Sequence, residues 1–265
     1  MSNTSQPFAG QVALVTGASS GIGRATAEAL AAGGADVALN YYSLPQDAEA
    51  TAEKIRAMGR KALLFPVDIS DQAAVEAMVS ETVDKLGRLD VYISSAVYSD
   101  REPFTTADMA GFKKTIDISL YGAFYGLRAW ANHLLKLKRR GSAVIVSSPH
   151  GTIAFPNCMA YNIAKAGLDM MMKSAARELM THRIRVNGIY PGWTDTPGER
   201  KFTSDEEIAK QAAKQPWGRL ATPEEIARGI VFLADPASDF ITGTILHLEG
   251  GLFLPWWSSR GEGDF

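Results

Sequence analysis

Residues 12–23, which read VALVTGASSGIG, decide the fold of this chain. The first four residues form an apolar run typical of a strand that is buried on both faces. Gly17, Gly21 and Gly23 follow, and residues 25–34 (ATAEALAAGG) then have the composition of a helix. A glycine-rich turn between strand and helix lets backbone N–H groups approach a phosphate. The stretch therefore predicts a dinucleotide-binding βα unit, and a plain strand-to-helix turn is the weaker alternative.

Outward from this unit, apolar runs alternate with helical segments. We expect strands at 12–17, 36–42, 61–70, 89–97, 142–148, 184–192 and 244–251, and helices at 25–34, 48–60, 72–87, 108–138, 160–180 and 224–235. Helices of this length between strands are the crossovers that a parallel sheet requires. The pattern predicts one α/β domain over residues 1–265, with a doubly wound parallel sheet of about seven strands and helices on both faces.

Composition excludes several classes of function. The chain has 265 residues and a formal net charge of −2, which gives no bulk attraction to nucleic acid. The basic run KLKRR at 136–140 is interpreted as the solvated end of a helix. The single cysteine, Cys158, excludes an internal disulfide, and the four histidines lack ligand spacing, so no metal site is expected. Without a secretory leader or a long apolar run, we expect a cytoplasmic protein that does not enter a membrane.

The end of the second expected strand bears on the choice of cofactor. It reads NYYS at 40–43, with no acid to accept ribose hydroxyls and repel a 2′-phosphate. Asp36 stands at the other end of that strand. The sequence therefore favours NADP(H) over NAD(H), or the use of both. Asp68, after the third strand, is either a cap for the next helix or an acceptor for the adenine amine.

A second stretch, SSPHGTIAFPNCMAYNIAK at 147–165, suggests chemistry. Ser148 ends an apolar run, and Tyr161 and Lys165 stand one helical turn apart on the same face. Taken singly, a serine after a strand is usually a turn residue, and a Tyr–Lys pair at this spacing occurs by chance in many helices. Placed behind a dinucleotide loop on a parallel sheet, the three residues favour a catalytic group.

Together these motifs resemble the short-chain dehydrogenase/reductase family over residues 8–251. The resemblance is carried by TGASSGIG at 16–23, Val67 and Asp68, Ser148 with YNIAK at 161–165, NGIYPG at 187–192, Gly243, and EGG at 249–251. It extends to the glucose 1-dehydrogenase and 3-oxoacyl reductase branches. The resemblance implies a Rossmann-like fold and an NAD(P)-dependent enzyme that interconverts an alcohol and a carbonyl by hydride transfer.

The resemblance also implies catalytic roles. Tyr161 would be the general acid/base, although an ordinary tyrosine has a pKa of ~10. The charge of Lys165 would lower that pKa, and the lysine would bind the nicotinamide ribose. Ser148 would hydrogen-bond the substrate oxygen. Ser119 stands where the family places an asparagine of a proton relay.

Cofactor contacts follow from the same resemblance. They are Gly17, Ser19, Ser20, Gly21, Ile22 and Gly23 in the glycine loop, Tyr41, Tyr42 and Ser43, Asp68 and Ile69, Ser95, Ala96 and Val97, Ile118, Tyr161 and Lys165, and Pro191, Gly192, Trp193, Thr194 and Thr196. The substrate would meet Ser148, His150, Tyr161 and Trp193, beneath a lid formed by 193–223.

Two departures from the family pattern bear on activity. The stretch SSAV at 94–97 has Val97 where a glycine is usual, which predicts crowding near the cofactor. Ser119, in DISLYG at 117–122, offers a hydroxyl in place of an amide. The alternatives to an active oxidoreductase are therefore a cofactor-binding regulator with weakened turnover, and a lyase or epimerase on the same fold.

The C-terminal tail, residues 252–265, contains Trp256 and Trp257. Exposed aromatic residues of this size often mark an interface. Family members commonly assemble as tetramers, so we expect a homotetramer; folding of the two tryptophans onto their own subunit is the alternative. The expected ligand is a small molecule, and the residues alone do not separate a sugar from a 3-oxoacyl substrate.

Overall fold

The computed structural model describes residues 6–201 and 204–254, and it contains one seven-stranded sheet. The strands are β1 (Val12–Val15), β2 (Asp36–Tyr41), β3 (Ala62–Pro66), β4 (Val91–Ser94), β5 (Gly141–Val146), β6 (Ile184–Pro191) and β7 (Ile245–Leu248). Their order is β3-β2-β1-β4-β5-β6-β7, and every neighbouring pair is parallel. The predicted doubly wound parallel sheet is confirmed.

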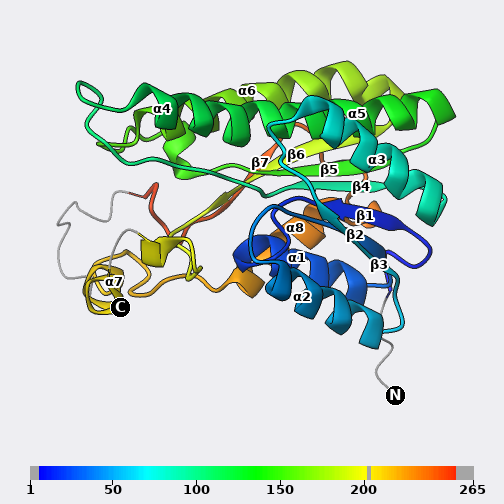
Figure 1. Ribbon diagram of the computed structural model, residues 1–265, viewed down its shortest axis with the longest axis horizontal. Coiled ribbons are helices and arrows are strands. Elements are labelled where there is room, and N and C mark those ends of the chain that lie inside the picture. Colours follow the sequence, from blue (N-terminus) through cyan, green and yellow to red (C-terminus); the bar gives the residue numbers. More distant parts are fainter. Residues whose placement is uncertain (1–5, 202–203, 255–265) are drawn as a thin grey trace.

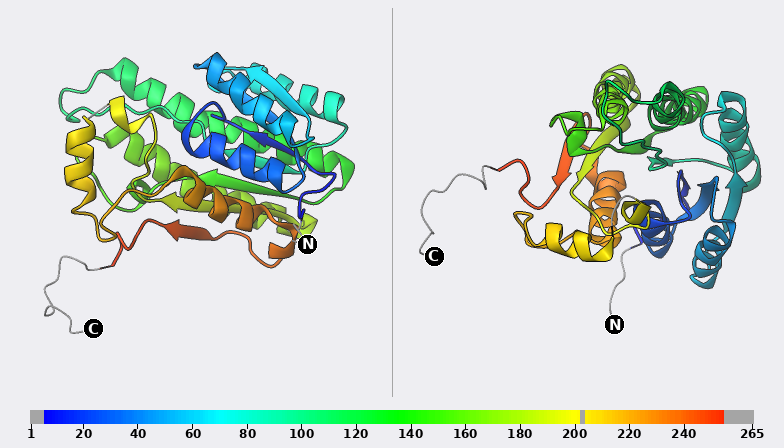
Figure 2. Two further views of the ribbon diagram at one scale, coloured as in Figure 1. Left: turned by 90° about the horizontal axis from the view of Figure 1, so that it is seen from below. Right: turned by 60° about the vertical axis from the view of Figure 1, so that its left-hand side comes forward.

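Helices cover both faces of this sheet (Figures 1 and 2). They are α1 (Gly21–Ala32), α2 (Pro45–Ala57), α3 (Gln72–Leu86), α4 (Met109–Ile116), α5 (Gly122–Leu137), α6 (Met159–Leu179), α7 (Asp205–Ala212) and α8 (Pro223–Ala234). Figure 1 shows α1, α2 and α8 below the sheet and α3, α5 and α6 above it. Each layer encloses its own hydrophobic core, with Leu30, Ile55 and Ile230 on one side and Met78, Trp130 and Leu168 on the other.

The strand order reverses between β1 and β4, and this reversal positions the site. In such sheets, ligands bind at the reversal, beyond the carboxyl ends of the strands. The loops that leave β1 and β4 are joined there, because the Thr16 hydroxyl accepts hydrogen bonds from the backbone N–H groups of Ser95 (3.0 Å) and Ala96 (3.1 Å).

Several elements are shorter or shifted relative to the prediction, including β3, β4 and β7, and three local features were not foreseen. The expected long helix at 108–138 contains a π-helical turn over Asp117–Tyr121, between α4 and α5. The polar segment 193–223 contains the short helix α7. The suggestion that Asp68 caps α3 is wrong: Asp71 is the cap and accepts from Ala74 N–H, while the Asp68 carboxylate accepts from Ser70 in a local turn.

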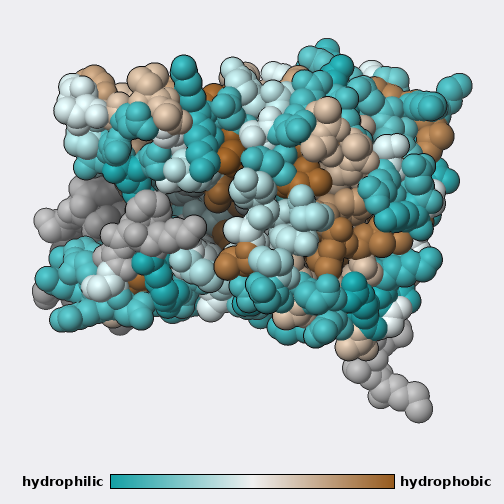
Figure 3. Space-filling model, in the orientation of Figure 1, coloured by the Kyte–Doolittle hydropathy of each residue, from teal (hydrophilic) through white to brown (hydrophobic). Residues whose placement is uncertain are grey.

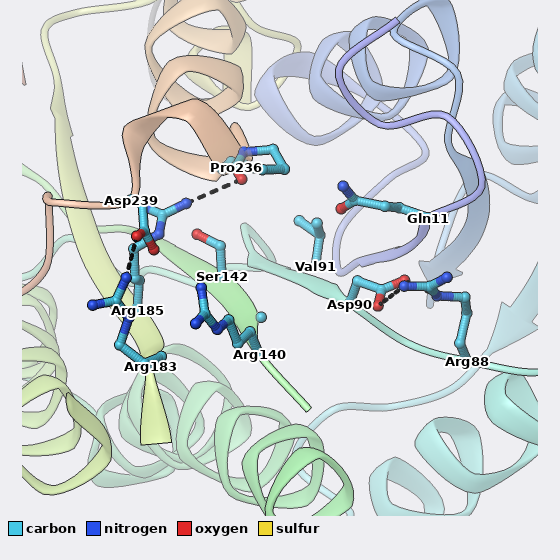
Figure 4. Close-up of a pocket in the computed structure, with 12 residues that line it drawn as sticks. Gln11, Arg88, Asp90, Val91, Arg140, Ser142, Arg183, Arg185, Pro236 and Asp239 are labelled. Carbon is cyan, nitrogen blue, oxygen red and sulfur yellow. Dashed lines mark hydrogen bonds and ion pairs between the residues drawn. The ribbon is translucent and has the colours of Figure 1, made fainter. Parts of the chain in front are cut away.

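A cavity of about 360 Å³ lies at the amino ends of β4, β5 and β6, opposite to the carboxyl ends where the predicted site lies (Figure 4). Four arginines line it, and three of them are already engaged. Arg88 binds Asp90 through two bonds of 2.7 and 2.8 Å, and Arg183 pairs with Asp239. Arg185 donates to carbonyl groups at the end of α8, including that of Leu233 at 2.7 Å. Arg185 therefore joins β6 to α8 beside this cavity. The cavity lies away from the predicted catalytic residues.

Candidate active site

The glycine loop is shaped by close backbone contacts that only glycine permits. Gly17 has φ +67°, and a Cβ there would stand 2.8 Å from the Ala96 Cα. A Cβ on Gly23 would stand 2.2 Å from the carbonyl oxygen of Gly17. The loop therefore folds tightly between β1 and α1, against the loop that follows β4.

The start of α1 has the features of an anion site. Its N-cap residue, Ser20, makes no side-chain capping bond, and the first turn contains no acidic residue. By contrast, α3, α4, α7 and α8 each begin with a side chain that accepts from their own N–H groups, whereas α2 and α6 also begin without such a cap. The first N–H groups of α1 are therefore left for an external acceptor, which suits the pyrophosphate of a dinucleotide.

Asn40 also shapes the loop, and sequence reasoning did not single it out. Its side-chain amide donates to the Val67 carbonyl at 2.9 Å and accepts from Gly17 N–H at 3.4 Å. The residue is buried at the end of β2. In the sequence, Asn40 could have been recognised as a polar residue inside the apolar run DVALNY, because a buried amide needs hydrogen-bond partners.

The expected ribose site is open to solvent. Tyr42 is 74% exposed, Ser43 is exposed and Tyr41 is half-buried. Asp36 lies at the far end of β2, where its carboxylate accepts from Lys61 N–H at 2.8 Å. Ile69 is buried, and a Cβ on Gly122 at the start of α5 would lie 2.8 Å from its side chain. Ile69 therefore also serves to pack α5 against the loop after β3.

Ser148, Tyr161 and Lys165 meet at the carboxyl end of β5. Ser148 follows β5, and its hydroxyl accepts from His150 N–H at 3.3 Å. Tyr161 lies in the first turn of α6, and Lys165 lies on the next turn. The Lys165 ammonium is buried, donates to the Val146 carbonyl at 2.8 Å, and lies 5.2 Å from the centre of the Tyr161 ring.

The protonation behaviour of Tyr161 differs from the prediction. Burial raises the pKa of Tyr161 to about 12, although a hydrogen bond with Ser148 opposes the rise. Burial lowers the pKa of Lys165 to about 8, against the opposing effect of Asp169. The expected depression of the tyrosine pKa by Lys165 is not seen in this structure, where burial is the largest influence on the Tyr161 hydroxyl. The Tyr161 hydroxyl is therefore protonated at pH 7.

Asp169 lies one turn beyond Lys165 and ties α6 to the sheet. It is buried, and its carboxylate accepts from the Ser147 hydroxyl at 2.6 Å and from the Tyr190 hydroxyl at 2.5 Å. The Tyr190 hydroxyl is also 2.9 Å from that of Thr152. Ser147 thus has a structural role, which agrees with the choice of Ser148 as the catalytic serine. In the sequence, Asp169 could have been recognised as an acidic residue on the apolar face of the predicted helix.

We expect Asp169→Asn to shift the pH dependence of carbonyl reduction. The Asp169 charge raises the pKa of Lys165, so its loss lowers that pKa, and the lysine then becomes neutral at a lower pH. Reduction should therefore decline at a lower pH than in the wild type, as measured by kcat/KM between about pH 6 and 10. Ser147→Ala is the matched control: it removes one bond to Asp169, costs about 1–2 kcal/mol of stability, and keeps the charge. An unchanged profile for Asp169→Asn would contradict the expectation.

Ser119 is buried in the π-helical turn, and within the described residues it has no hydrogen bond to Ser148, Tyr161 or Lys165. Its hydroxyl donates to the Tyr98 carbonyl at 2.6 Å and accepts from Tyr98 N–H at 3.0 Å. It therefore anchors the loop after β4. Ile118, its neighbour, packs partly buried against the core. The Val97 side chain is 51% exposed, so the protein itself does not crowd it.

The residues after β6 form one wall of the site. Thr194 is buried, and its hydroxyl donates to the Gly192 carbonyl at 2.8 Å. The Thr196 methyl group packs close to Gly21, 3.0 Å from the position that a Cβ on this glycine would take. The start of the lid segment therefore lies on the glycine loop. Pro191, the last residue of β6, lies opposite Leu248 of β7, and Gly192 donates its N–H to the Leu248 carbonyl at 2.8 Å and packs against Glu249.

Trp193 is tied to Glu199 within the same segment. Its indole N–H donates to the Glu199 carboxylate at 2.9 Å, and Arg101, from the loop before α4, lies 3.5 Å from the same carboxylate. Figure 3 shows the surface hollowed between the two helical layers, with hydrophobic residues along the hollow. Trp217 is 68% exposed in the lid. Phe202 and the pair Trp256 and Trp257 lie outside the described residues.

The described residues contain no cluster of three His, Cys, Asp or Glu side chains that could hold a metal ion. Within the same ranges, no helix is long and apolar enough to cross a membrane.

Comparison with known proteins agrees with this geometry. Residues 17–253 match the family described as Enoyl-(Acyl carrier protein) reductase. A cis-4-hydroxycyclohexanecarboxylate dehydrogenase of Sinomonas cyclohexanicum is 38% identical over 93% of this chain and 98% of its own length. Glucose 1-dehydrogenase 2 of Bacillus subtilis is 31% identical, with coverages of 92% and 95%, and a 3-oxoacyl-[acyl-carrier-protein] reductase of Synechocystis sp. is 34% identical, with 92% and 97%.

A solved structure gives the same result. The carveol dehydrogenase of Mycobacterium avium in complex with NAD superimposes with a TM-score of 0.88 at 29% identity, over 94% of this chain and 99% of that one. The fold and site thus define a nicotinamide-dependent oxidoreductase with a Rossmann-like domain. The chain belongs to the short-chain dehydrogenase/reductase family and interconverts alcohol and carbonyl groups. Both branches named from the sequence are among its relatives.

Proposed function

We propose that Tyr161, Lys165 and Ser148 carry this reaction on a small organic alcohol or ketone. The observation that supports the proposal is their convergence at the carboxyl end of β5, near the uncapped start of α1. The close-packed glycine loop and the free N–H groups of α1 fit a dinucleotide. Residues 17–23 would hold its pyrophosphate, and Thr194 and Thr196 would face its nicotinamide end.

The side chains of the protein donate and accept the proton of the reaction. The nicotinamide ring supplies or accepts the hydride when it is bound. In reduction, Tyr161 donates its proton to the carbonyl oxygen, and the Ser148 hydroxyl donates a hydrogen bond to the same oxygen. The Lys165 charge then stabilises the resulting phenolate. In oxidation, the phenolate takes the hydroxyl proton of the alcohol.

A screen of sugars, polyols, cyclic alcohols, 3-oxoacyl thioesters and simple ketones tests this function. Activity is followed by the absorbance of the reduced nicotinamide, and cofactor binding by calorimetry. We expect turnover that is lost in a Tyr161 variant. Cofactor binding without turnover of any class would instead indicate a regulator, and product without a net change in cofactor would indicate a lyase or epimerase. Failure to bind either cofactor would refute the proposal.

The cofactor is proposed to be NADP(H), or both cofactors. The support is the exposed end of β2, which carries Tyr42 and Ser43 hydroxyls and no acid. The ratio of kcat/KM for the two cofactors tests this. Ser43→Asp should lower the use of NADP(H) by repelling the 2′-phosphate. A wild-type preference for NAD(H) by tenfold or more would contradict it.

A homotetramer is proposed because exposed apolar side chains gather on two parts of the surface. Tyr121 and Phe124 lie at the start of α5, at 46% and 45% exposed, while Phe232 on α8 and Phe240 before β7 are 51% and 103% exposed. Two self-complementary patches can generate a tetramer of two-fold symmetry. A monomeric mass by light scattering at micromolar concentration would refute this. A cytoplasmic location is also proposed, since a chain with one cysteine does not rely on internal disulfides for its stability.

A further inference from the structure

His150 lies beside the proposed catalytic residues but has no part in the steps above. Its ring stacks on Phe155, with ring centres 4.1 Å apart, and meets the Tyr161 ring nearly edge-on at 4.9 Å. Its backbone N–H donates to the Ser148 hydroxyl oxygen. The ring is therefore held on two sides, next to both groups that would bind the reacting oxygen.

The hydrogen bonds around His150 fix its tautomer. The Asn162 amide nitrogen donates to the Phe155 carbonyl at 2.9 Å, which sets the orientation of that amide. The amide oxygen consequently faces the His150 Nδ1 atom at 2.7 Å. A carbonyl oxygen can only accept, so Nδ1 must carry the hydrogen. In a neutral imidazole the other nitrogen, Nε2, then holds a lone pair.

This lone pair is available near neutral pH. Burial lowers the pKa of His150 to about 4, although the bond to Asn162 opposes that shift. The ring therefore stays neutral above about pH 5. Nε2 has no hydrogen bond within the described residues. It is also not one of their fully buried polar atoms that lack a partner, so a ligand can reach it. The half-buried ring thus offers an acceptor that is open to the cleft.

We infer that His150 Nε2 accepts a hydrogen bond from a second hydroxyl group of the substrate, close to the carbon that reacts. The substrate class is then diols and polyhydroxylated ring compounds rather than monohydric alcohols. The inference rests on the proposed function, because Tyr161 and Ser148 place the reacting oxygen beside the imidazole. A monohydric alcohol would bury this acceptor without a partner, which selects against it.

The kinetic test compares cis-1,2-cyclohexanediol with cyclohexanol, using kcat/KM for each. The wild type should prefer the diol. His150→Phe keeps an aromatic ring against Phe155 but removes the acceptor, so the preference should fall about 10-fold or more. His150→Gln, whose amide oxygen can accept, should restore part of it. An unchanged diol preference in His150→Phe would overturn the inference.

A second measurement needs no turnover. In protein with ¹⁵N-labelled histidine, assigned by comparison with His150→Phe, Nδ1 should carry the hydrogen and Nε2 should be bare. Asn162→Leu should release the tautomer, because it removes the oxygen that fixes it. Saturating diol with NADPH, a pair that cannot react, should shift the Nε2 resonance. A protonated Nε2, or an Nε2 resonance that does not change when the diol is added to the cofactor complex, would overturn the inference. If neither alcohol is oxidised yet Nε2 responds to the diol, the proposed catalysis fails and the acceptor role stands.

Discussion

Tyr161→Phe should lower turnover by about 10²- to 10⁴-fold, the usual contribution of a positioned acid or base. The change removes only the hydroxyl, the group that would give the proton to the carbonyl oxygen. Because burial raises the pKa of Tyr161 to about 12, the wild-type hydroxyl is protonated throughout the neutral range. The loss should therefore be seen in kcat for reduction at pH 7, with product measured by absorbance of the cofactor.

Binding of the cofactor should change little in this variant. The glycine loop and the start of α1 would hold the pyrophosphate, and neither depends on the tyrosine hydroxyl. Calorimetry of cofactor binding checks this directly. Tyr121→Phe is the matched control, since Tyr121 is 46% exposed in the π-helical turn and should keep wild-type turnover. Full activity in Tyr161→Phe would refute the acid/base role.

Local sequence patterns predicted the scaffold of the site well. The glycine loop and the Tyr161–Lys165 pair are set by short spacings, so a strand-to-helix turn and one helical turn were enough to place them. The parallel sheet followed from the lengths of the crossovers. Ser148 could be preferred over Ser147 only through the family resemblance, and the bond from Ser147 to Asp169 gives a physical reason.

The supporting contacts could not be read in the same way, because they join distant segments. Asp169 on α6 meets Tyr190 on β6, and Thr16 after β1 meets the backbone after β4. Ser119, in the π-helical turn, is bonded to the backbone of Tyr98, which lies 21 residues earlier in the chain. Such pairings require knowledge of which strands are neighbours.

Burial was the other quantity missing from the sequence. A lysine one turn from a tyrosine suggested a lowered phenol pKa, yet enclosure of the Tyr161 hydroxyl raises it. Likewise, the sequence placed His150 beside the substrate, but its packing against the Phe155 and Tyr161 rings became evident only in three dimensions. Desolvation is a property of the packed state and has no local signature.

The second large effect is expected for Lys165→Met. The ammonium group donates to the Val146 carbonyl and lies beside the Tyr161 ring, and its charge favours the phenolate that reduction leaves behind. Its removal should lower turnover by about 100-fold or more. The same variant should bind the cofactor more weakly, if the lysine holds the nicotinamide ribose as the family resemblance implies.

The pH profile separates this electrostatic role from a merely structural one. Burial lowers the pKa of Lys165 to about 8, so its charge is present below pH 8 and is lost as the pH rises through that value. Wild-type kcat/KM for reduction should therefore fall above about pH 8, although the coupled Tyr161 shares the apparent value. In Lys165→Met the rate should be low at every pH and show no such fall, because no charge remains to be lost. Lys173→Met, on an exposed position of the same helix, should keep both the rate and the inflection. An inflection that persists in Lys165→Met would assign it to another group and remove Lys165 from the proton chemistry.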